Sequence, residues 1–297
     1  MRAAAILGLG SSTKALGLFQ KDSSASWTMG LPASPADAIL IFGGDGTIHR
    51  HLAQLVKLRL PVLVVPCGSG NDFARALNLR SLQDSLAAWR KFSTGGGNVR
   101  TIDLGVITSL DSAATGNLKP ETGNSSYFCC VAGVGLDGEI ARRANRLPRW
   151  LRAHGGYALS LPAAVLRFTS QPIKILTVDK NDPDVFLERS NQPTLVAAFA
   201  NTPVYGGGMK IAPHALLDDG RLDVCVVGNV ARLRLLRLFP SVYFGRHLGI
   251  REVKYFQAER LRIETERPLD VYADGEYVCR TPIEVSVAPR TLTVLMP

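Results

Sequence analysis

Two glycine-rich turns, each placed directly after an apolar segment, constrain the fold of this chain most strongly. "GGDGT" (43–47) follows "ADAILIF" (36–42), and "CGSGND" (67–72) follows "PVLVVP" (61–66). Short, continuously apolar segments are typical of strands buried on both faces of a parallel sheet. Parallel strands end at the same edge of a sheet, so the backbone N–H groups of both turns can converge there. Two such turns, each leading into a helix, favour a phosphate-binding cradle over plain turns.

The pattern of the chain changes after about residue 100. Before that point apolar strands alternate with helical segments such as 47–60 and 81–92, the second of which Ser81 is placed to cap. After it, many short strands separated by turns predict a β-sandwich-like unit. We therefore expect a two-domain α+β protein. Residues 1–104 form an α/β domain with a parallel sheet, and 105–297 form the β-rich domain, whose last strand is a candidate to return to the first.

The chain carries an excess of positive charge. It has 34 Lys and Arg against 25 Asp and Glu, a formal net charge of +9. Such a balance suits an anionic partner: nucleic acid, nucleotide phosphate or an anionic membrane surface. Basic residues cluster in 141–156 and in 231–239, and solvated helix faces explain each cluster equally well. Aromatic residues make up 7% of the chain and none accompany the glycine turns, so we do not expect nucleic-acid binding.

The cysteines and the apolar runs indicate a cytoplasmic protein. Five cysteines occur without any CxxC pair, and the adjacent Cys129 and Cys130 are expected to point to opposite faces of a strand. Free, buried thiols in a reducing compartment are the expected state. No apolar run approaches the ~18 residues that a membrane span requires. Homodimer formation is left open by the sequence.

Two common nucleotide-binding motifs do not account for the glycine turns. The segment "GLGSSTK" near the start has a lysine, but its glycine spacing is wrong for a P-loop. "GVGLDG" (133–138) fits GxGxxG, yet a dinucleotide site would need an acidic residue ~20 positions later, where the chain has "RAHGGYAL". A lone GxGxxG is weak support for dinucleotide binding.

Several segments, taken together and in order, resemble one enzyme family. "GGDGTIHRHL" and "PCGSGNDFARAL" are followed by "IDLG" (102–105), "VAGVGLDGEI" (131–140), "NTPVYGGGMKIAPHALLDDGRLDV" (201–224) and "ADGEYV" (273–278). This series is similar to the catalytic region shared by diacylglycerol kinases, sphingosine kinases and related bacterial lipid kinases, within the NAD kinase-like superfamily. The resemblance covers nearly the whole chain, and it implies a kinase that phosphorylates a lipid hydroxyl.

The resemblance implies that ATP lies across the two glycine turns, with Asp45 facing the metal–nucleotide. Phosphoryl transfer needs positioning and charge neutralisation, and Mg²⁺ would supply positive charge because no P-loop lysine is present. Asp103 and Asp137 match acidic positions that support the site; turn capping is the alternative for each. The residues assigned to the nucleotide are Gly43, Gly44, Gly46, Thr47, Gly68, Ser69, Gly70, Asn71, Asp72, Gly10, Ser11, Ser12, Asp103 and Asp137.

"ADGEYV" supplies a candidate general base. If the stretch is a strand, Asp274 and Glu276 point the same way and could face one cleft; an exposed β-turn is the alternative. A carboxylate there suits removal of a proton from a lipid hydroxyl. The resemblance favours Glu276 as the base, with Asp274 as an assistant or metal contact. The histidines form no convincing metal set, and His49 and His51 are expected to be surface or packing residues.

The segment "HALLDDGRLDV" (214–224) is rich in the oxygen ligands that hard cations prefer. The matching segment of bacterial lipid kinases holds a structural Mg²⁺. The resemblance therefore implies a site made by the side chain of Asp219 and the carbonyls of Leu216 and Arg221. An ordinary Asp-Asp-Gly turn is the alternative.

The N-terminal region departs from the family pattern. Relatives usually have a further strand and helix before GGDGT, whereas "QKDSSASWTMGLPASP" (20–35) reads as coil. A strand–helix piece is therefore expected to be shortened or missing, which puts the contacts assigned to Gly10, Ser11 and Ser12 in doubt.

We expect an ATP-dependent lipid kinase that acts on diacylglycerol to give phosphatidate and associates transiently with an anionic membrane surface. Sphingoid bases, ceramide or another lipid remain alternative acceptors. The GGDG turn also occurs in NAD kinases and phosphofructokinases, so a soluble-metabolite kinase is a rival. A non-catalytic nucleotide- or lipid-binding pseudokinase is the third alternative.

Overall fold

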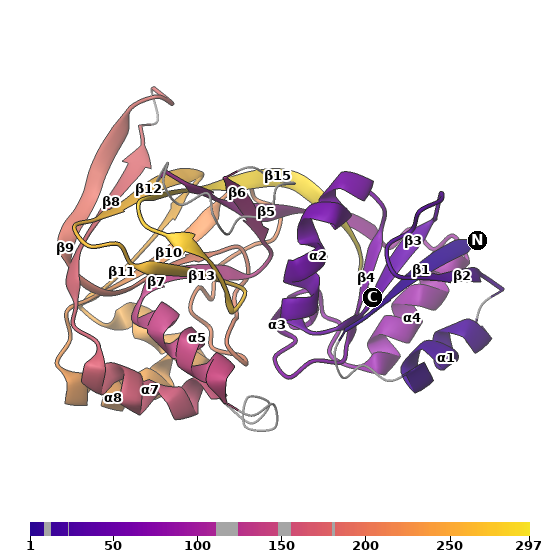
Figure 1. Cartoon of the computed structure of the whole chain (residues 1–297), viewed down its shortest axis with the longest axis horizontal. Coiled ribbons are helices and arrows are strands. Elements are labelled where there is room, and N and C mark those ends of the chain that lie inside the picture. The colour runs from indigo at the N-terminus through magenta and orange to yellow at the C-terminus, as the bar shows by residue number, and fades with distance from the viewer. Residues whose placement is uncertain (9–12, 23, 111–123, 148–155, 180–181) are drawn as a thin grey trace.

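The computed structural model describes residues 1–8, 13–22, 24–110, 124–147, 156–179 and 182–297. Figure 1 shows two lobes joined by long strands, with the N-terminal lobe on the right and the β-rich lobe on the left. The N- and C-termini both lie in the N-terminal lobe. The arrangement confirms the expected α/β and β-sandwich-like parts.

The N-terminal lobe is built on parallel strands in the order β2-β1-β3-β4. Every residue of β3 is buried, which explains why its sequence is apolar without alternation. Helices α1 and α4 pack against each other on one side, and α2 lies on the side that faces the other lobe (Figure 1). The strands are β1 (Arg2–Leu7), β2 (Ser26–Met29), β3 (Ala38–Gly43) and β4 (Val62–Pro66). The helices are α1 (Thr13–Asp22), α2 (Asp45–Leu58), α3 (Asp72–Ala76) and α4 (Leu82–Ser93).

Local sequence explains the start of α4 and the buried face of α2. Ser81 caps α4 by accepting a hydrogen bond from the amide of Asp84, whose carboxylate accepts from the amide of Ser81 in return. This capping box satisfies two amides that a helix start leaves unpaired. The apolar positions of α2, Ile48, Leu52 and Leu55, are buried on one face, as the helical spacing predicts.

The β-rich lobe is an antiparallel assembly with its own buried core of aliphatic and aromatic side chains. The path β14-β13-β7-β9-β8-β12-β15 runs through it, and β10 extends the sheet from β9 to β11. Its first strands are β5 (Val99–Ser109), β6 (Ser125–Phe128), β7 (Val131–Gly135), β8 (Gln171–Val178) and β9 (Phe186–Ala200). The later strands are β10 (Leu222–Gly228), β11 (Val253–Ala258), β12 (Arg260–Thr265), β13 (Asp270–Ala273), β14 (Glu276–Arg280) and β15 (Ile283–Leu295).

Strand β15 connects the two lobes. It pairs with β5 along almost its full length, and near its end Val294 pairs in parallel with Val62 of β4. Its final residues therefore complete the sheet of the first lobe, as Figure 1 shows.

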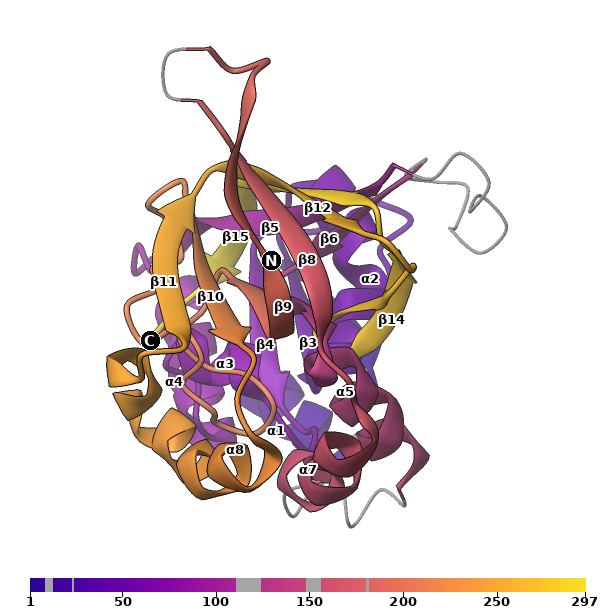
Figure 2. The ribbon, with the colours of Figure 1, turned by 90° about the vertical axis from the view of Figure 1, so that its left-hand side faces the viewer.

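A layer of helices covers one end of the β-rich lobe, opposite the long β8–β9 hairpin in Figure 2. Leu136 and Ile140 of α5 pack with Leu161 and Val165 of α7, and side chains of the α8 region complete this cluster. The layer consists of α5 (Leu136–Arg146), α7 (Gly156–Arg167), α8 (Arg232–Leu238), η1 (Phe239–Phe244) and η2 (Arg246–Gly249).

Two expectations about local structure are wrong. The segment 20–35 is not all coil, because it contains the end of α1 and the parallel strand β2. The strand escaped prediction since it is a short edge strand with little buried surface, held by Trp27, whose ring centroid lies 5.5 Å from that of Trp89. Cys129 and Cys130 do not alternate along a strand but form the bend between β6 and β7, with their Sγ atoms 3.9 Å apart.

Candidate active site

The two glycine turns meet at the edge of the parallel sheet. A Cβ atom on Gly44 would lie 2.8 Å from the Cα atom of Gly68, so the two backbones touch where neither residue has a side chain. The amide of Cys67 also donates to the carbonyl of Gly43 over 3.0 Å. The convergence predicted from the sequence is confirmed. The turns 43–47 and 67–72 together present bare backbone at the edge of the sheet, and we call this edge the glycine rim.

Asp45 joins the first turn to the helix that follows the second. It is the first residue of α2, and its carboxylate accepts hydrogen bonds from the amides of Asp72 and Phe73, both over 3.0 Å. Gly70 approaches it closely, because a Cβ there would lie 2.9 Å from Asp45 Oδ2. Burial, together with the nearby charge of Asp72, raises the pKa of Asp45 to about 6. A cation beside these two carboxylates would offset their repulsion.

The second turn is closed by its own side chains. Asn71, at a φ of 56°, accepts from the amide of Gly68 over 2.9 Å and donates to the carbonyl of Gly68 over 2.7 Å. Asp72 is buried and accepts from Arg75 over 2.6 Å and from the amide of Gly207 over 2.8 Å. Burial raises the pKa of Asp72. Through the bond from its amide to Asp72, Gly207 of the β-rich lobe reaches the second glycine turn. Ser69 is exposed there.

Asp274 comes to the rim from the other lobe. It does not lie on a strand: Asp274 and Gly275, with φ of 51° and 84°, form the two-residue turn between β13 and β14. An Asp-Gly pair between apolar strands is the usual sign of such a hairpin. The expectation that Asp274 and Glu276 face one cleft by strand alternation is therefore wrong in its geometry.

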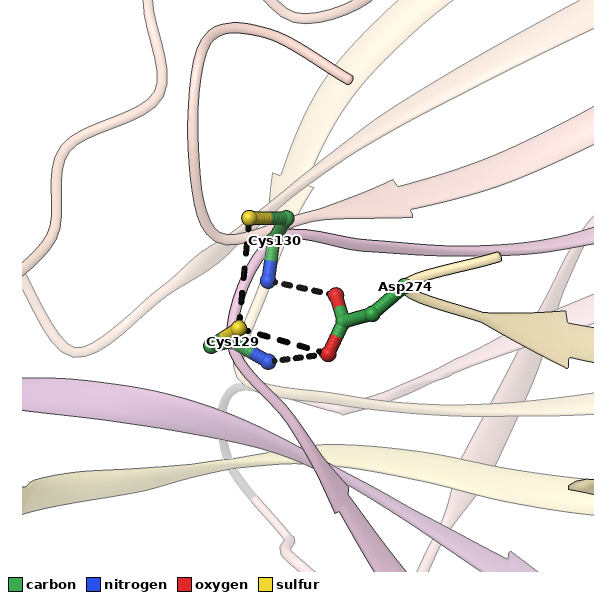
Figure 3. Close-up of side chains that lie close together, drawn as sticks. All are labelled: Cys129, Cys130 and Asp274. Atoms are coloured by element: carbon green, nitrogen blue, oxygen red, sulfur yellow. Dashed lines mark hydrogen bonds between the residues drawn. The ribbon is translucent and has the colours of Figure 1, made fainter. Parts of the chain in front are cut away.

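The carboxylate of Asp274 is held by the bend between β6 and β7. Its oxygens accept from the amides of Cys129 over 2.9 Å and Cys130 over 2.8 Å (Figure 3). They also accept from the amide of Val131 over 3.3 Å. Burial by itself raises the pKa of Asp274, but hydrogen bonds from His49 and from these amides outweigh it and lower that pKa below its usual value. Asp274 is thus a fixed anion.

His49 is the residue at the rim that sequence reasoning missed. Its Nδ1 atom lies 3.2 Å from Asp274 Oδ2, so the histidine on α2 joins the first lobe to the β13–β14 turn of the second. Because the carboxylate accepts, Nδ1 carries the proton of this hydrogen bond. Helical spacing along α2 gave no signal for this contact, since the partner is 225 positions away in the sequence.

Glu276 lies at the same helix start. A Cβ atom on Gly46 would lie 2.8 Å from Glu276 Oε1, so the glutamate reaches over the glycine turn only because residue 46 has no side chain. Glu276 is exposed, whereas Asp274 two residues earlier is enclosed. An exposed carboxylate next to a bare backbone rim can accept a proton from a bound hydroxyl group.

Cys129, Cys130 and Asp274 bring three possible metal ligands within 4.8 Å of one another. Burial raises the pKa of both thiols, that of Cys130 to about 12. Metals bind the thiolate, and these cysteines stay protonated at neutral pH. Cys129 Sγ instead donates to Asp274 over 3.3 Å. The cluster is better suited to holding Asp274 than to binding a metal.

Asp103 and the candidate magnesium turn lie together. Asp103 is buried and accepts from the amides of Gly220 and Arg290, each over 2.7 Å, so it supports the Asp-Asp-Gly turn. Asp219 accepts from the amide of Arg221 over 3.1 Å and from Gln257 over 3.2 Å. Leu216, at the start of this turn, is exposed. The turn offers the oxygen donors that Mg²⁺ prefers.

Asp137 lies at an apolar cavity rather than among the contacts of the glycine turns. It is buried at the start of α5 and accepts from the hydroxyl of Tyr205 over 2.7 Å. Burial raises the pKa of Asp137 to about 6. The cavity has a volume of about 100 Å³, and aliphatic and aromatic side chains form nearly all of its wall.

The start of α2 also contacts the end of β1. Thr47 packs against Gly43, where a Cβ would lie 2.7 Å from Thr47 Oγ1, and it approaches Gly8 as well. The other expected nucleotide contacts in this region, Gly10, Ser11 and Ser12, lie outside the described residues.

Comparison with known proteins decides the family. The sequence profile of the diacylglycerol kinase catalytic domain matches residues 18–107, and that of the YegS C-terminal NAD kinase β sandwich-like domain matches residues 130–296. A diacylglycerol kinase of Mycobacterium tuberculosis (strain CDC 1551 / Oshkosh) is 33% identical over 265 residues, which are 89% of this chain and 78% of that protein. The chain belongs to the diacylglycerol kinase family. It is a lipid kinase.

Solved structures show the same fold. A diacylglycerol kinase from Bacillus anthracis str. Sterne has a TM-score of 0.66 at 18% identity, covering 100% of this chain and 97% of that one. An NAD kinase from Archaeoglobus fulgidus, solved in complex with ATP, has a TM-score of 0.53 at 16% identity, covering 99% and 93%. Among the described residues of this lipid kinase, no helix is long and apolar enough to cross a bilayer.

Proposed function

We propose that this lipid kinase transfers the γ-phosphoryl group of ATP to the free hydroxyl of diacylglycerol, giving phosphatidate and ADP. The observation that carries the proposal is the position of Glu276, an exposed carboxylate from the β-rich lobe held directly over Gly46 of the glycine rim. A base from one lobe thereby meets a phosphate-binding rim from the other. Similarity to a diacylglycerol kinase of M. tuberculosis supports the choice of acceptor.

The glycine rim is the proposed ATP site. The N-terminus of α2 and the backbone amides of the two turns would bind the phosphate oxygens, because amides and the helix dipole favour anions. The amides of Thr47, Gly68 and Asp72 are excepted, since they already donate to acceptors within the turns. The touching backbones of Gly44 and Gly68 keep side chains out of this rim. Thr47 adds a hydroxyl near the end of β1.

The carboxylates at the rim fit a hard cation. Asp45 and Asp72 lie side by side with raised pKa values, and Asp274 adds a fixed negative charge from the second lobe. Mg²⁺ bound there would neutralise phosphate charge during transfer. A second, structural Mg²⁺ is proposed at Asp219 with the carbonyls of Leu216 and Arg221, on the turn that Asp103 supports.

Glu276 is the proposed general base. It would accept the proton of the lipid hydroxyl as the oxygen forms its bond to the γ-phosphorus and the bond to the β-phosphate oxygen breaks. Asp274 positions Glu276, because its anchored carboxylate fixes the turn from which Glu276 projects. Positioning of this kind contributes much of the rate in phosphoryl transfer.

The apolar cavity is the proposed site for a lipid chain. Its wall includes Leu161, Met209, Leu238 and Val242, which suit an acyl tail. The hydrogen-bonded pair of Asp137 and Tyr205 is the polar part of this wall. The buried acid favours one second candidate, a sphingoid base, because an ammonium group could pair with ionised Asp137.

A panel assay tests the proposal. The protein would be incubated with labelled ATP, Mg²⁺ and detergent micelles that contain diacylglycerol, ceramide or sphingosine, and the products would be identified by mass spectrometry. We expect phosphatidate as the main product. Preferred labelling of sphingosine, abolished in Asp137→Asn, would establish the second candidate. No phosphorylated lipid from any acceptor would contradict the proposal and favour a nucleotide- or lipid-binding pseudokinase.

A further inference from the structure

The helical segment 231–249 has two chemically different sides. One side closes the apolar cavity through Leu235, Leu238, Phe239 and Val242, which follow each other at helical spacing. The segment is therefore a wall between the proposed lipid site and the exterior. Figure 2 shows α8 at the lower end of the β-rich lobe, at the opposite end from the long β8–β9 hairpin.

The other side of this wall exposes large apolar side chains. Leu233 is 83% exposed and Phe244 is 71% exposed, and on neighbouring α7 Leu166 is 61% exposed. These are the three most exposed large apolar side chains in the described parts of the chain. Leu166 lies on α7 and Leu233 on α8, which lie beside each other in Figure 1, and Phe244 ends η1, which follows and contacts α8. The three residues therefore belong to the same layer of helices. Grouped apolar exposure of this kind marks an interaction surface.

The same segment is rich in arginine. Residues 231–249 contain Arg232, Arg234, Arg237 and Arg246 and no Asp or Glu. Arg237 follows Leu233 by one helical turn, and the guanidinium of Arg246 lies 5.9 Å from the ring centroid of Phe244. Arg234 is paired with Glu252, whereas the exposed Arg232, Arg237 and Arg246 form no ion pair with any residue that the structure describes.

We propose that segment 231–249 docks on an anionic phospholipid bilayer and that the lipid substrate enters the cavity past this wall. The proposal rests on the proposed function only in taking the cavity as the lipid site. Exposed Leu and Phe flanked by arginines are the composition of an interfacial membrane contact, where cations meet acidic head groups. A second copy of this chain is a poorer occupant, because two arginine-rich surfaces would face each other.

Vesicle co-sedimentation tests this inference. Wild-type protein is expected to bind vesicles of phosphatidylcholine with phosphatidylglycerol, and to bind pure phosphatidylcholine less. The double variant Leu233→Ser/Phe244→Ser should bind the anionic vesicles about tenfold or more weakly, because two large apolar side chains no longer insert. A control variant, Leu187→Ser/Met29→Ser, removes exposed apolar residues elsewhere and should bind as the wild type does.

A second double variant separates the contribution of charge to vesicle binding from the contribution of apolar insertion. Arg232→Gln/Arg237→Gln should weaken binding to anionic vesicles and reduce its sensitivity to salt, with little effect on phosphatidylcholine vesicles. Unchanged binding by the Leu233→Ser/Phe244→Ser variant, or no preference of the wild type for anionic vesicles, would overturn the inference. A shift of that variant from dimer to monomer by light scattering, with vesicle binding intact, would also overturn it by showing contact with a second copy.

Activity distinguishes failure here from failure of the proposed function. Short-chain diacylglycerol in nonionic detergent does not require docking on a bilayer, so the Leu233→Ser/Phe244→Ser variant should keep wild-type activity on it. The same variant should lose activity on diacylglycerol embedded in anionic vesicles. A wild type that is inactive on both substrates would refute the proposed function, while the vesicle-binding result would still decide the docking surface.

Discussion

At the scale of single residues, the rim shows how far residue types alone lead. Asp45, Asp274 and Glu276 could be chosen from the sequence because the segments that contain them resemble the lipid kinase family, and carboxylates near a nucleotide suit phosphoryl transfer. The geometry of these residues could not be predicted, since Asp274 belongs to a hairpin turn rather than to a strand. His49 was missed altogether because its partner is contributed by the other lobe.

Replacing His49 tests whether this contact positions the base. In His49→Ala the β13–β14 turn loses its bond to α2, so we expect kcat to fall by about tenfold to a hundredfold with little change in KM for ATP. His49→Asn, which keeps a donor, should recover part of the loss. Arg50→Ala, an exposed change on the same helix, is the control. Steady-state kinetics with wild-type kcat in His49→Ala would show that the contact is only structural.

Asp137 should make stability depend on pH. Its pKa is about 6 in the folded chain against 3.8 ordinarily, so between those values the folded state holds more protons and stability falls as pH rises. The difference corresponds to about 3 kcal/mol in the free energy of unfolding. Urea unfolding at about pH 4 and about pH 7 should show this loss reduced in Asp137→Asn but not in the exposed control Asp184→Asn. Equal pH dependence in all three proteins would contradict this prediction.

At the scale of elements, apolar runs and caps were reliable and contacts between elements were not. Strands β3 and β4, helix α2 and the capping box of α4 follow from local pattern, because their cores and caps lie within a few residues. The short edge strand β2 and the bend at Cys129 and Cys130 depend on packing that local pattern does not contain. The same holds for Asp103 and Asp137, whose partners lie far away in the sequence.

The close approach of the two glycine turns can be tested directly. In Gly44→Ala the new Cβ would lie 2.8 Å from the Cα atom of Gly68, and backbone cannot rotate out of the way as a side chain can. The turns should separate, and ATP affinity measured by calorimetry should fall at least tenfold. Gly17→Ala is the matched control, since nothing lies within 4 Å of that position. Unchanged affinity in Gly44→Ala would show that the touching turns are not the ATP site.

At the scale of the whole molecule, the two lobes share a sheet through β15. The family profiles match 18–107 and 130–296, whereas the domain boundary after residue 104 stays a prediction. The sequence suggested that the last strand could return to the first lobe, and Val294 does pair with Val62. Which strand it joins could not be read from its own residues, because pairing partners far apart in sequence leave no local signal.

Weakening the packing at the end of β15, where it pairs with β4, should destabilise the molecule. Val294 is fully buried, and Val294→Ala should lower the free energy of unfolding by about 2 kcal/mol. The neighbouring change Thr293→Ala, at a less buried position, should cost less. Urea unfolding followed by circular dichroism measures both. Equal small losses would indicate that the end of β15 contributes little to the first lobe.

The role of Glu276 as general base is tested by the initial rate of ³²P transfer from γ-³²P-labelled ATP into a chloroform-extractable lipid, compared between wild type and Glu276→Gln. The amide keeps the size of the side chain but cannot accept the proton, so the rate should fall about a hundredfold or more while ATP binding stays unchanged. Wild-type transfer by Glu276→Gln would contradict the proposed mechanism, because the carboxylate over the glycine rim would then take no part in phosphorylating the lipid.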